Sequence, residues 1–174
     1  METINAALFI LRIGLGVVFL AHGIKHARGR VKTTAWFGSL GFKNPGFQWF
    51  ASTATEIGVG VLLVLGLLTG LAAAGVIGIM AVAFYTVHRK AGFFITAFMK
   101  DGIDVEGYEY VLTLAIAALA LAVGGPGEWS IDASLKIDSV PLAELLDGRI
   151  GLLLAVGGVA TSLAQLAAFW RPNE

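Results

Sequence analysis

Two ionisable residues, Arg12 and Glu56, stand inside long apolar stretches of the chain. A charge at the centre of a bilayer costs at least about 2.5 kcal/mol, so charged residues retained there are usually paired and often functional. Measured from the same end of their helices at about 1.5 Å per residue, Arg12 lies about 18 Å deep and Glu56 about 13 Å. The difference of roughly 5 Å is within side-chain reach. The sequence therefore predicts an Arg12–Glu56 ion pair, and leaves open whether its role is structural or functional.

A second group of polar residues gathers at the expected ends of three apolar stretches. It comprises His22, Lys25, His26, Tyr85, His88, Glu106, Glu109 and Tyr110. We expect all of them at one membrane level, where histidine and carboxylate groups could bind the carbonyl oxygens of a quinone and supply protons for its reduction. Tyr85 and Tyr110 are also typical of an interfacial aromatic belt. No metal site is expected, and no spacing motif supports haem ligation by the histidines.

The composition indicates a membrane protein. Of 174 residues, 57% are hydrophobic and 14% are charged, and the mean hydropathy of +0.81 lies outside the range of ordinary soluble domains. The formal net charge of zero provides no basic surplus for a nucleic-acid partner. Cysteine is absent, which excludes disulfide exchange, thiolate catalysis and iron–sulfur ligation within the chain. An electron carrier would be haem, a quinone or a group held by another protein.

Five apolar stretches approach or reach the length needed to cross a hydrocarbon core about 30 Å thick. They are residues 4–24, 47–68, 71–88, 110–124 and 150–170. Only Thr69 and Gly70 separate the second stretch from the third, so these two are expected to form a tight hairpin. Lys and Arg concentrate in the first and third loops and after the last stretch, whereas the opposite side holds only Lys136 and Arg149. The positive-inside rule then places the N-terminus outside a bacterial inner membrane and the C-terminus in the cytoplasm.

The loops carry further signals. Aromatic residues interleaved with Gly and Pro in the first loop predict a short interfacial or re-entrant segment. The third loop repeats this pattern with Phe93, Phe94, Phe98 and Met99. Segment 128–147 is mostly polar and is expected to be an extracytoplasmic loop or surface helix. Residues 125–127 together with Asp132 are expected to form a turn and a cap after the fourth stretch, without chemistry of their own.

The last apolar stretch has one face of small and polar residues. These are Gly151, Ala155, Gly158, Ser162 and Gln165. Small residues let membrane helices approach closely. The pattern predicts that this helix packs on the bundle or on a second copy of the chain.

The order of several short motifs resembles the DoxX family. They are Leu11-Arg12-Ile13 with Gly16, His22-Gly23-Ile24-Lys25, Glu56 with Gly58-Val59-Gly60, Leu65-Gly66-Leu67-Leu68-Thr69, His88, Glu109-Tyr110, and Gly125-Pro126-Gly127 with Ser130-Ile131-Asp132. The resemblance implies a four-helix membrane bundle, here residues 1–133, and links to quinone-coupled thiosulfate oxidation and to membrane redox-defence assemblies. Carried over by position, the polar set of the family falls on Arg12, Lys25, Glu56, His88 and Glu109. Residues 134–174 depart from the four-helix pattern and are expected to add an extracytoplasmic connection and a fifth transmembrane helix.

We therefore expect an all-α membrane protein, and three functional classes fit it. The first is a membrane subunit of a redox complex that binds a quinone or a quinone-like lipid without a covalently bound cofactor. Its ligand-binding residues would be Arg12, Lys25, Glu56, His88 and Glu109, with His22, His26, Tyr85 and Tyr110. The second class is a non-catalytic scaffold or assembly factor, and the third is a carrier for a small solute. Expected partners are the lipid bilayer, proteins of a redox assembly and a second copy through the last helix, and whether the chain is an enzyme stays open.

Overall fold

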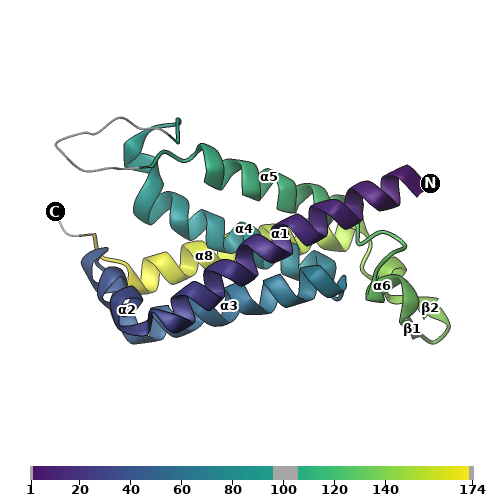
Figure 1. The fold of residues 1–174 in the computed structure, drawn as a ribbon, viewed down its shortest axis with the longest axis horizontal. Coiled ribbons are helices and arrows are strands. Elements are labelled where there is room, and N and C mark those ends of the chain that lie inside the picture. Colours follow the sequence, from purple (N-terminus) through teal and green to yellow (C-terminus); the bar gives the residue numbers. More distant parts are fainter. Residues whose placement is uncertain (1, 96–105, 173–174) are drawn as a thin grey trace.

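The computed structural model describes residues 2–95 and 106–172, and five long helices dominate it (Figure 1). These helices are α1 (Glu2–Arg28), α3 (Pro45–Leu65), α4 (Thr69–Ala83), α5 (Glu109–Gly124) and α8 (Gly148–Phe169). A π-helical segment η1 (Phe84–His88) and a 3₁₀ turn η2 (Arg89–Ala91) extend α4. The shorter elements are α2 (Arg30–Ser39), α6 (Ile131–Ser134), β1 (Lys136–Ile137), β2 (Val140–Pro141) and α7 (Leu142–Leu145).

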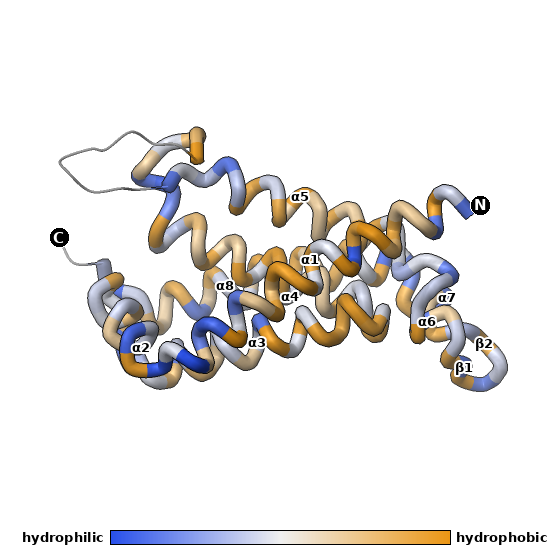
Figure 2. Tube along the Cα trace, in the orientation of Figure 1, coloured by the Kyte–Doolittle hydropathy of each residue, from blue (hydrophilic) through white to orange (hydrophobic). Residues whose placement is uncertain are grey.

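Four of the helical segments are long and apolar enough to cross a membrane. They are Glu2–Arg28, Pro45–Leu65, Thr69–Ala91 and Gly148–Phe169, and the shorter α5 is also apolar. Figure 2 shows hydrophobic residues along the middle of these helices and hydrophilic residues toward the two ends. The prediction of an all-α membrane bundle is confirmed.

The two ends of the bundle differ in structure (Figure 1). At one end, here called the α2 end, lie α2, the C-terminal part of α8 and the π-helical segment. At the other, here called the hairpin end, lie the N-terminus, α6 and the antiparallel strands β1 and β2. The first loop, where a short interfacial or re-entrant segment is predicted, contains the helix α2, and Phe98 and Met99 of the third loop lie outside the described residues.

Glycines allow α1 and α3 to pack closely. A Cβ atom built at Gly60 would lie 2.7 Å from the backbone nitrogen of Leu20 and 2.9 Å from the carbonyl oxygen of Gly16. At Gly23 it would lie 2.8 Å from the backbone nitrogen of Ile57. The two backbones therefore touch at positions where a larger residue could not fit.

The small-residue face of α8 packs on α4 and α5. A Cβ atom at Gly158 would lie 2.4 Å from the carbonyl oxygen of Ala74. The hydroxyl of Ser162 donates a hydrogen bond to the carbonyl oxygen of Gly78 at 2.9 Å. This confirms the prediction that the last helix packs on the bundle.

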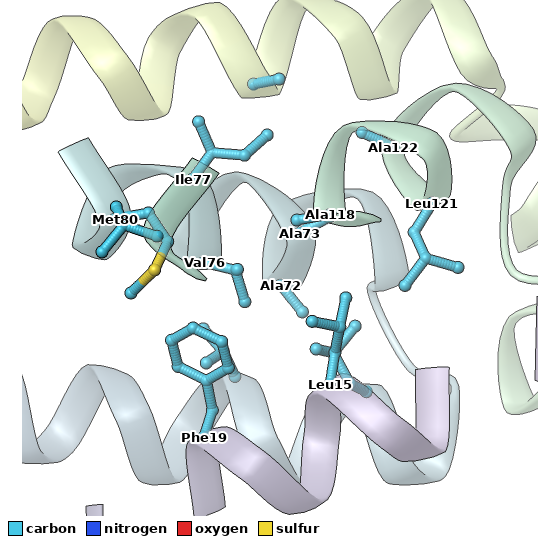
Figure 3. Packing of buried hydrophobic residues seen from close by; sticks show 14 residues of the cluster. Leu15, Phe19, Ala72, Ala73, Val76, Ile77, Met80, Ala118, Leu121 and Ala122 are labelled. Atoms are coloured by element: carbon cyan, nitrogen blue, oxygen red, sulfur yellow. The ribbon is translucent and has the colours of Figure 1, made fainter. Parts of the chain in front are cut away.

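The central core lies where α1, α3, α4 and α5 meet (Figure 3). Leu15 and Phe19 of α1 point toward Ala72 and Val76 of α4, and Leu121 comes from α5. Small alanine side chains in α4 and α5 keep these helices close together. Large apolar residues on the outer faces of α1, α5 and α8 stay exposed, as expected for helices that face lipid.

A tight turn at Gly66 to Leu68 joins α3 to α4, slightly earlier in the chain than predicted. Gly66 and Leu68 have positive φ angles of 65° and 49°. The buried carboxylate of Asp132 accepts hydrogen bonds from the backbone nitrogens of Leu68 at 2.7 Å and Thr69 at 2.9 Å. The cap expected after the fourth apolar stretch is therefore wrong for Asp132, because this residue folds back and caps the N-terminus of α4, where a negative charge is stabilised.

We expect Asp132→Ala to lower the free energy of unfolding by about 2–3 kcal/mol, because two buried N–H groups lose a charged acceptor. Asp132→Asn should lose roughly half as much, since one side-chain oxygen remains. Thermal unfolding in a mild detergent would measure both changes. Glu144→Ala, at an exposed position of α7, is the matched control and should leave the Tm unchanged. Equal Tm values for the Asp132 and Glu144 variants would refute the capping role.

Candidate binding cavity

A cavity of about 630 Å³ lies between α3, α4 and α8. Apolar side chains such as Val59, Ile79 and Val82 form most of its walls. His26 of α1 and Trp36 of α2 line it near the α2 end. Exposed residues of α3 and α8 also line it, among them Thr55, Leu153, Gly157 and Thr161. The cavity therefore opens sideways between these two helices, toward the surrounding lipid.

His26 and Glu56 form a polar pair that faces this cavity. The Nδ1 atom of His26 lies 2.8 Å from Oε2 of Glu56, and the two side chains are 19% and 6% exposed. Ser52, one helical turn from Glu56, lies near the other carboxylate oxygen at 3.5 Å. Trp49 donates a hydrogen bond from its indole nitrogen to the carbonyl oxygen of His26 at 2.9 Å and fixes the end of α1. A carboxylate at this depth needs a polar partner of this kind.

A second polar group lines the same cavity. The amide nitrogen of Gln165 in α8 donates a hydrogen bond to Oε1 of Gln48 in α3 at 2.7 Å. Gln48 is only 1% exposed, and its own amide nitrogen has no hydrogen-bond partner among the described residues. Gln48, Ser52 and Glu56 are spaced four residues apart, so they share one face of α3.

The predicted Arg12–Glu56 ion pair is wrong. The fully buried guanidinium of Arg12 donates hydrogen bonds to the carbonyl oxygens of Pro126 at 3.1 Å, Leu63 at 3.0 Å and Trp129. Among residues 2–95 and 106–172, no carboxylate oxygen forms an ion pair with it. The carboxylate of Asp132 is close enough to attract the guanidinium electrostatically. Arg12 thus fastens α1 to the end of α3 and to the loop after α5.

The offset between α1 and α3 explains why the two charges do not meet. Gly23 of α1 lies opposite Glu56, because a Cβ atom at Gly23 would be 3.1 Å from Cβ of Glu56. From Gly23 to Arg12 the helix rises about 16 Å, which no side chain can bridge. The depths estimated from the sequence assumed that the two apolar stretches end at one level, at residues 24 and 47. In the structure α1 continues to Arg28 and α3 begins at Pro45, so the two ends do not define a common level.

His88 and Glu109 both lie at the α2 end, outside the cavity lining. Nδ1 of His88 lies 2.8 Å from the carbonyl oxygen of Glu106, and the carboxylate of Glu109 accepts a hydrogen bond from the backbone nitrogen of Ile95 at 3.1 Å. Both contacts hold the described parts of the connection between η2 and α5 in place. The residues of the predicted cluster therefore do not form one group: His26 lies against Glu56, whereas His88 and Glu109 contact the connection before α5.

The remaining predicted site residues lie at the surface of the α2 end. Lys25 and His22 are exposed on α1, although the His22 ring lies 6.2 Å from the His26 ring. Tyr110 is 42% exposed, and Tyr85 packs with the aromatic cluster around Phe37. Ligand binding by these residues and by His88 and Glu109 stays a prediction.

Gln48 was missed as a site residue by the sequence reasoning. Gln165 was recognised only as part of a packing face. The four-residue spacing of Gln48, Ser52 and Glu56 was the available signal. It places Gln48 on the same helix face only if the helix already includes this residue, as it does in the structure, where α3 begins at Pro45. Within the part of the chain that the structure describes, no group of three His, Asp or Glu side chains is placed to hold a metal ion.

Comparisons with known proteins add to this picture. A family model described as DoxX matches residues 7–89. A Bacillus subtilis protein named "Putative oxidoreductase CatD" is 32% identical over 114 residues, which cover 64% of this chain and 75% of that protein. A Haemophilus influenzae protein described as uncharacterized is 25% identical over 140 residues, which cover 76% of this chain and 85% of that protein. No solved structure gives a significant match.

Proposed function

Because this chain belongs to the DoxX family of membrane proteins, we propose that it is a membrane subunit of a redox complex that binds a quinone or a quinone-like lipid. The relative named as an oxidoreductase supports a redox role. The observation that carries the proposal is the cavity of about 630 Å³, which is mainly apolar and has the half-buried His26 and the buried Glu56 in its wall. Lipid-soluble quinones combine an apolar tail with a headgroup that takes up protons when it is reduced.

The residues of the cavity suit the two parts of such a ligand. The apolar walls of α3, α4 and α8 would hold the tail, which enters from the lipid between α3 and α8. His26 would donate a hydrogen bond to a headgroup carbonyl oxygen, while Glu56 orients the imidazole from the Nδ1 side. A bound quinone would supply the electron-accepting chemistry, with electrons from a partner protein that carries its own cofactor.

The orientation inferred from the basic residues supports the direction of proton uptake. The α2 end carries Lys25, Arg28, Arg30, Lys32 and Lys43. By the positive-inside rule this end faces the cytoplasm of a bacterial inner membrane. The His26–Glu56 pair lies toward this end of the cavity, so it would draw its protons from the cytoplasmic side.

We expect the double variant His26→Leu with Glu56→Leu to retain about fivefold less quinone than the unmodified protein, because the lost hydrogen bond from His26 to the headgroup is worth about 1 kcal/mol. Replacing both partners avoids stranding one buried polar group. Mass spectrometry of lipids that co-purify in mild detergent would measure the quinone content. Lys32→Ala is the control, because this exposed residue of α2 lies at the same end but outside the cavity lining, and it should retain the full quinone content.

Two results would contradict the proposal. One is an unmodified protein that carries only ordinary phospholipid, which would favour the scaffold role. The other is equal quinone content in the cavity variant and in the unmodified protein, with both folded as judged by their Tm.

A further inference from the structure

We infer that the amide of Gln48, held in place by Gln165 of α8, recognises a carbonyl oxygen of the bound ligand, so that the fifth long helix completes the binding site. The inference rests on the proposed function, because it assigns a specificity-determining contact within the same cavity. Neither the matched family segment, residues 7–89, nor the names of the relatives assign any role to α8.

The first observation is an unpaired donor in a buried place. Gln48 is 1% exposed and lines the cavity, yet its amide nitrogen has no partner among the described residues. A buried N–H group without an acceptor costs about 1–3 kcal/mol. Native proteins rarely retain such a group without a use for it. An acceptor oxygen supplied by a ligand would remove the cost.

The second observation is that Gln165 fixes the orientation of this amide. Its nitrogen donates to Oε1 of Gln48 at 2.7 Å, so the acceptor side of Gln48 is occupied and the donor side is the free one. A neutral amide does not titrate, so it offers a donor whatever the proton state of the His26–Glu56 pair. The free group therefore selects for a ligand with a carbonyl oxygen over one that is purely hydrocarbon.

The third observation is that α8 is held firmly at the level of Gln165. Ser162 bonds to the carbonyl oxygen of Gly78 on α4, and beyond the helix the indole nitrogen of Trp170 donates to the carbonyl oxygen of Leu40 at 2.8 Å. The backbone nitrogen of Lys43 also donates to the carbonyl oxygen of Phe169 at 2.7 Å. These contacts on both sides of Gln165 keep its amide against Gln48. Preorganisation of this kind lowers the entropy lost on binding.

The polar face of α3 then offers a series of groups to one headgroup. Gln48, Ser52 and Glu56 follow one another along α3 at intervals of four residues, which is a rise of about 6 Å each. One carbonyl oxygen of the ligand meets the amide of Gln48, and the opposite side of the headgroup faces Ser52 and the His26–Glu56 pair. A ligand with oxygens on both sides of a ring fits this spacing.

The test compares two ligands on three proteins, namely the unmodified protein, Gln48→Met and Gln165→Met. The ligands are a benzoquinone with a decyl tail and decylbenzene, which lacks both carbonyl oxygens. Binding of the quinone is followed by quenching of tryptophan fluorescence, since Trp36 lines the cavity, and decylbenzene is measured by competition. We expect Gln48→Met to weaken quinone binding about tenfold and to leave the affinity for decylbenzene unchanged. Gln165→Met should weaken quinone binding by a smaller factor, because it only releases the amide.

A second measurement separates recognition from a structural role. Gln48→Met and Gln165→Met both remove the hydrogen bond between the two amides, so the two variants should lower the Tm of the ligand-free protein by similar amounts. A lower Tm together with unchanged quinone affinity would overturn the inference and identify Gln48 as a packing residue.

The outcomes also separate this inference from the proposed function. If the unmodified protein binds the quinone no more tightly than decylbenzene, the proposed function fails. If the unmodified protein prefers the quinone and Gln48→Met retains that preference in full, only the role of Gln48 fails.

Discussion

Replacing Arg12 by methionine is expected to lower the free energy of unfolding by about 3–5 kcal/mol, because three hydrogen bonds from a charged donor are lost, each worth about 1.5–3 kcal/mol, while the cost of burying the charge is recovered. The variant leaves the carbonyl oxygens of Leu63, Pro126 and Trp129 without the donor that they share. The loss also separates the loop after α5 from α1, because two of these oxygens belong to that loop. Arg12→Lys keeps the charge but lacks the planar fork of donors, so it should recover only part of the stability. Thermal unfolding in detergent, or resistance to a denaturing detergent, would measure the series.

The double variant Arg12→Met with Glu56→Gln gives the decisive comparison. Gly23 of α1 lies opposite Glu56, and Arg12 lies about 16 Å further along α1. The losses in unfolding free energy of the two single variants should therefore add to within about 0.5 kcal/mol. An ion pair would instead make the double variant clearly less harmful than the sum of the single ones. Such a coupling energy above about 1 kcal/mol would refute the contacts described for Arg12.

Replacing Gly60 by alanine is expected to lower the free energy of unfolding by about 1–3 kcal/mol, the usual cost of overpacking a tight interface. The added Cβ atom would lie 2.7 Å from the backbone nitrogen of Leu20 and 2.9 Å from the carbonyl oxygen of Gly16. Backbone atoms cannot move aside as a flexible side chain can, so α1 and α3 would have to separate. Gly60→Val should cost more than Gly60→Ala for the same reason.

Gly58 provides the control on the same helix. A Cβ atom at Gly58 would meet nothing within 4 Å. Gly58→Ala should therefore leave the protein equally stable or raise its stability by up to about 1 kcal/mol, because alanine favours the helix over glycine. If Gly58→Ala and Gly60→Ala gave the same Tm, close approach of α1 and α3 would not be what holds this interface together.

The helices could be predicted from the sequence because membrane spans depend on local composition. The apolar stretch at residues 150–170 became α8, Gly148–Phe169, and the one at residues 110–124 became α5, Glu109–Gly124. The packing face of α8 could also be predicted from the sequence, because small residues at helical spacing in an apolar segment are typical of close contact between membrane helices. Local pattern thus sufficed for the number and type of the long elements.

The partners of Arg12 could not be predicted, because they are backbone carbonyl oxygens that any residue supplies. Which oxygens are free depends on where α3 ends and on how residues 125–132 fold, and sequence spacing encodes neither. The pairing of Glu56 failed for a related reason, since the offset of α1 against α3 is set by contacts such as that of Gly23 with Ile57. His26 was recognised as a site residue, but its partner followed only from this offset.

The contacts of Arg12 also bear on the order in which the protein is made. Pro126 and Trp129 follow Arg12 by 114 and 117 positions in the chain, whereas Leu63 follows it by 51. During translation, α3 and α4 are therefore synthesised before two of the three acceptors of Arg12 leave the ribosome. The full set of hydrogen bonds made by Arg12 can therefore form only after the fourth long helix has been translated, although α1 is synthesised first.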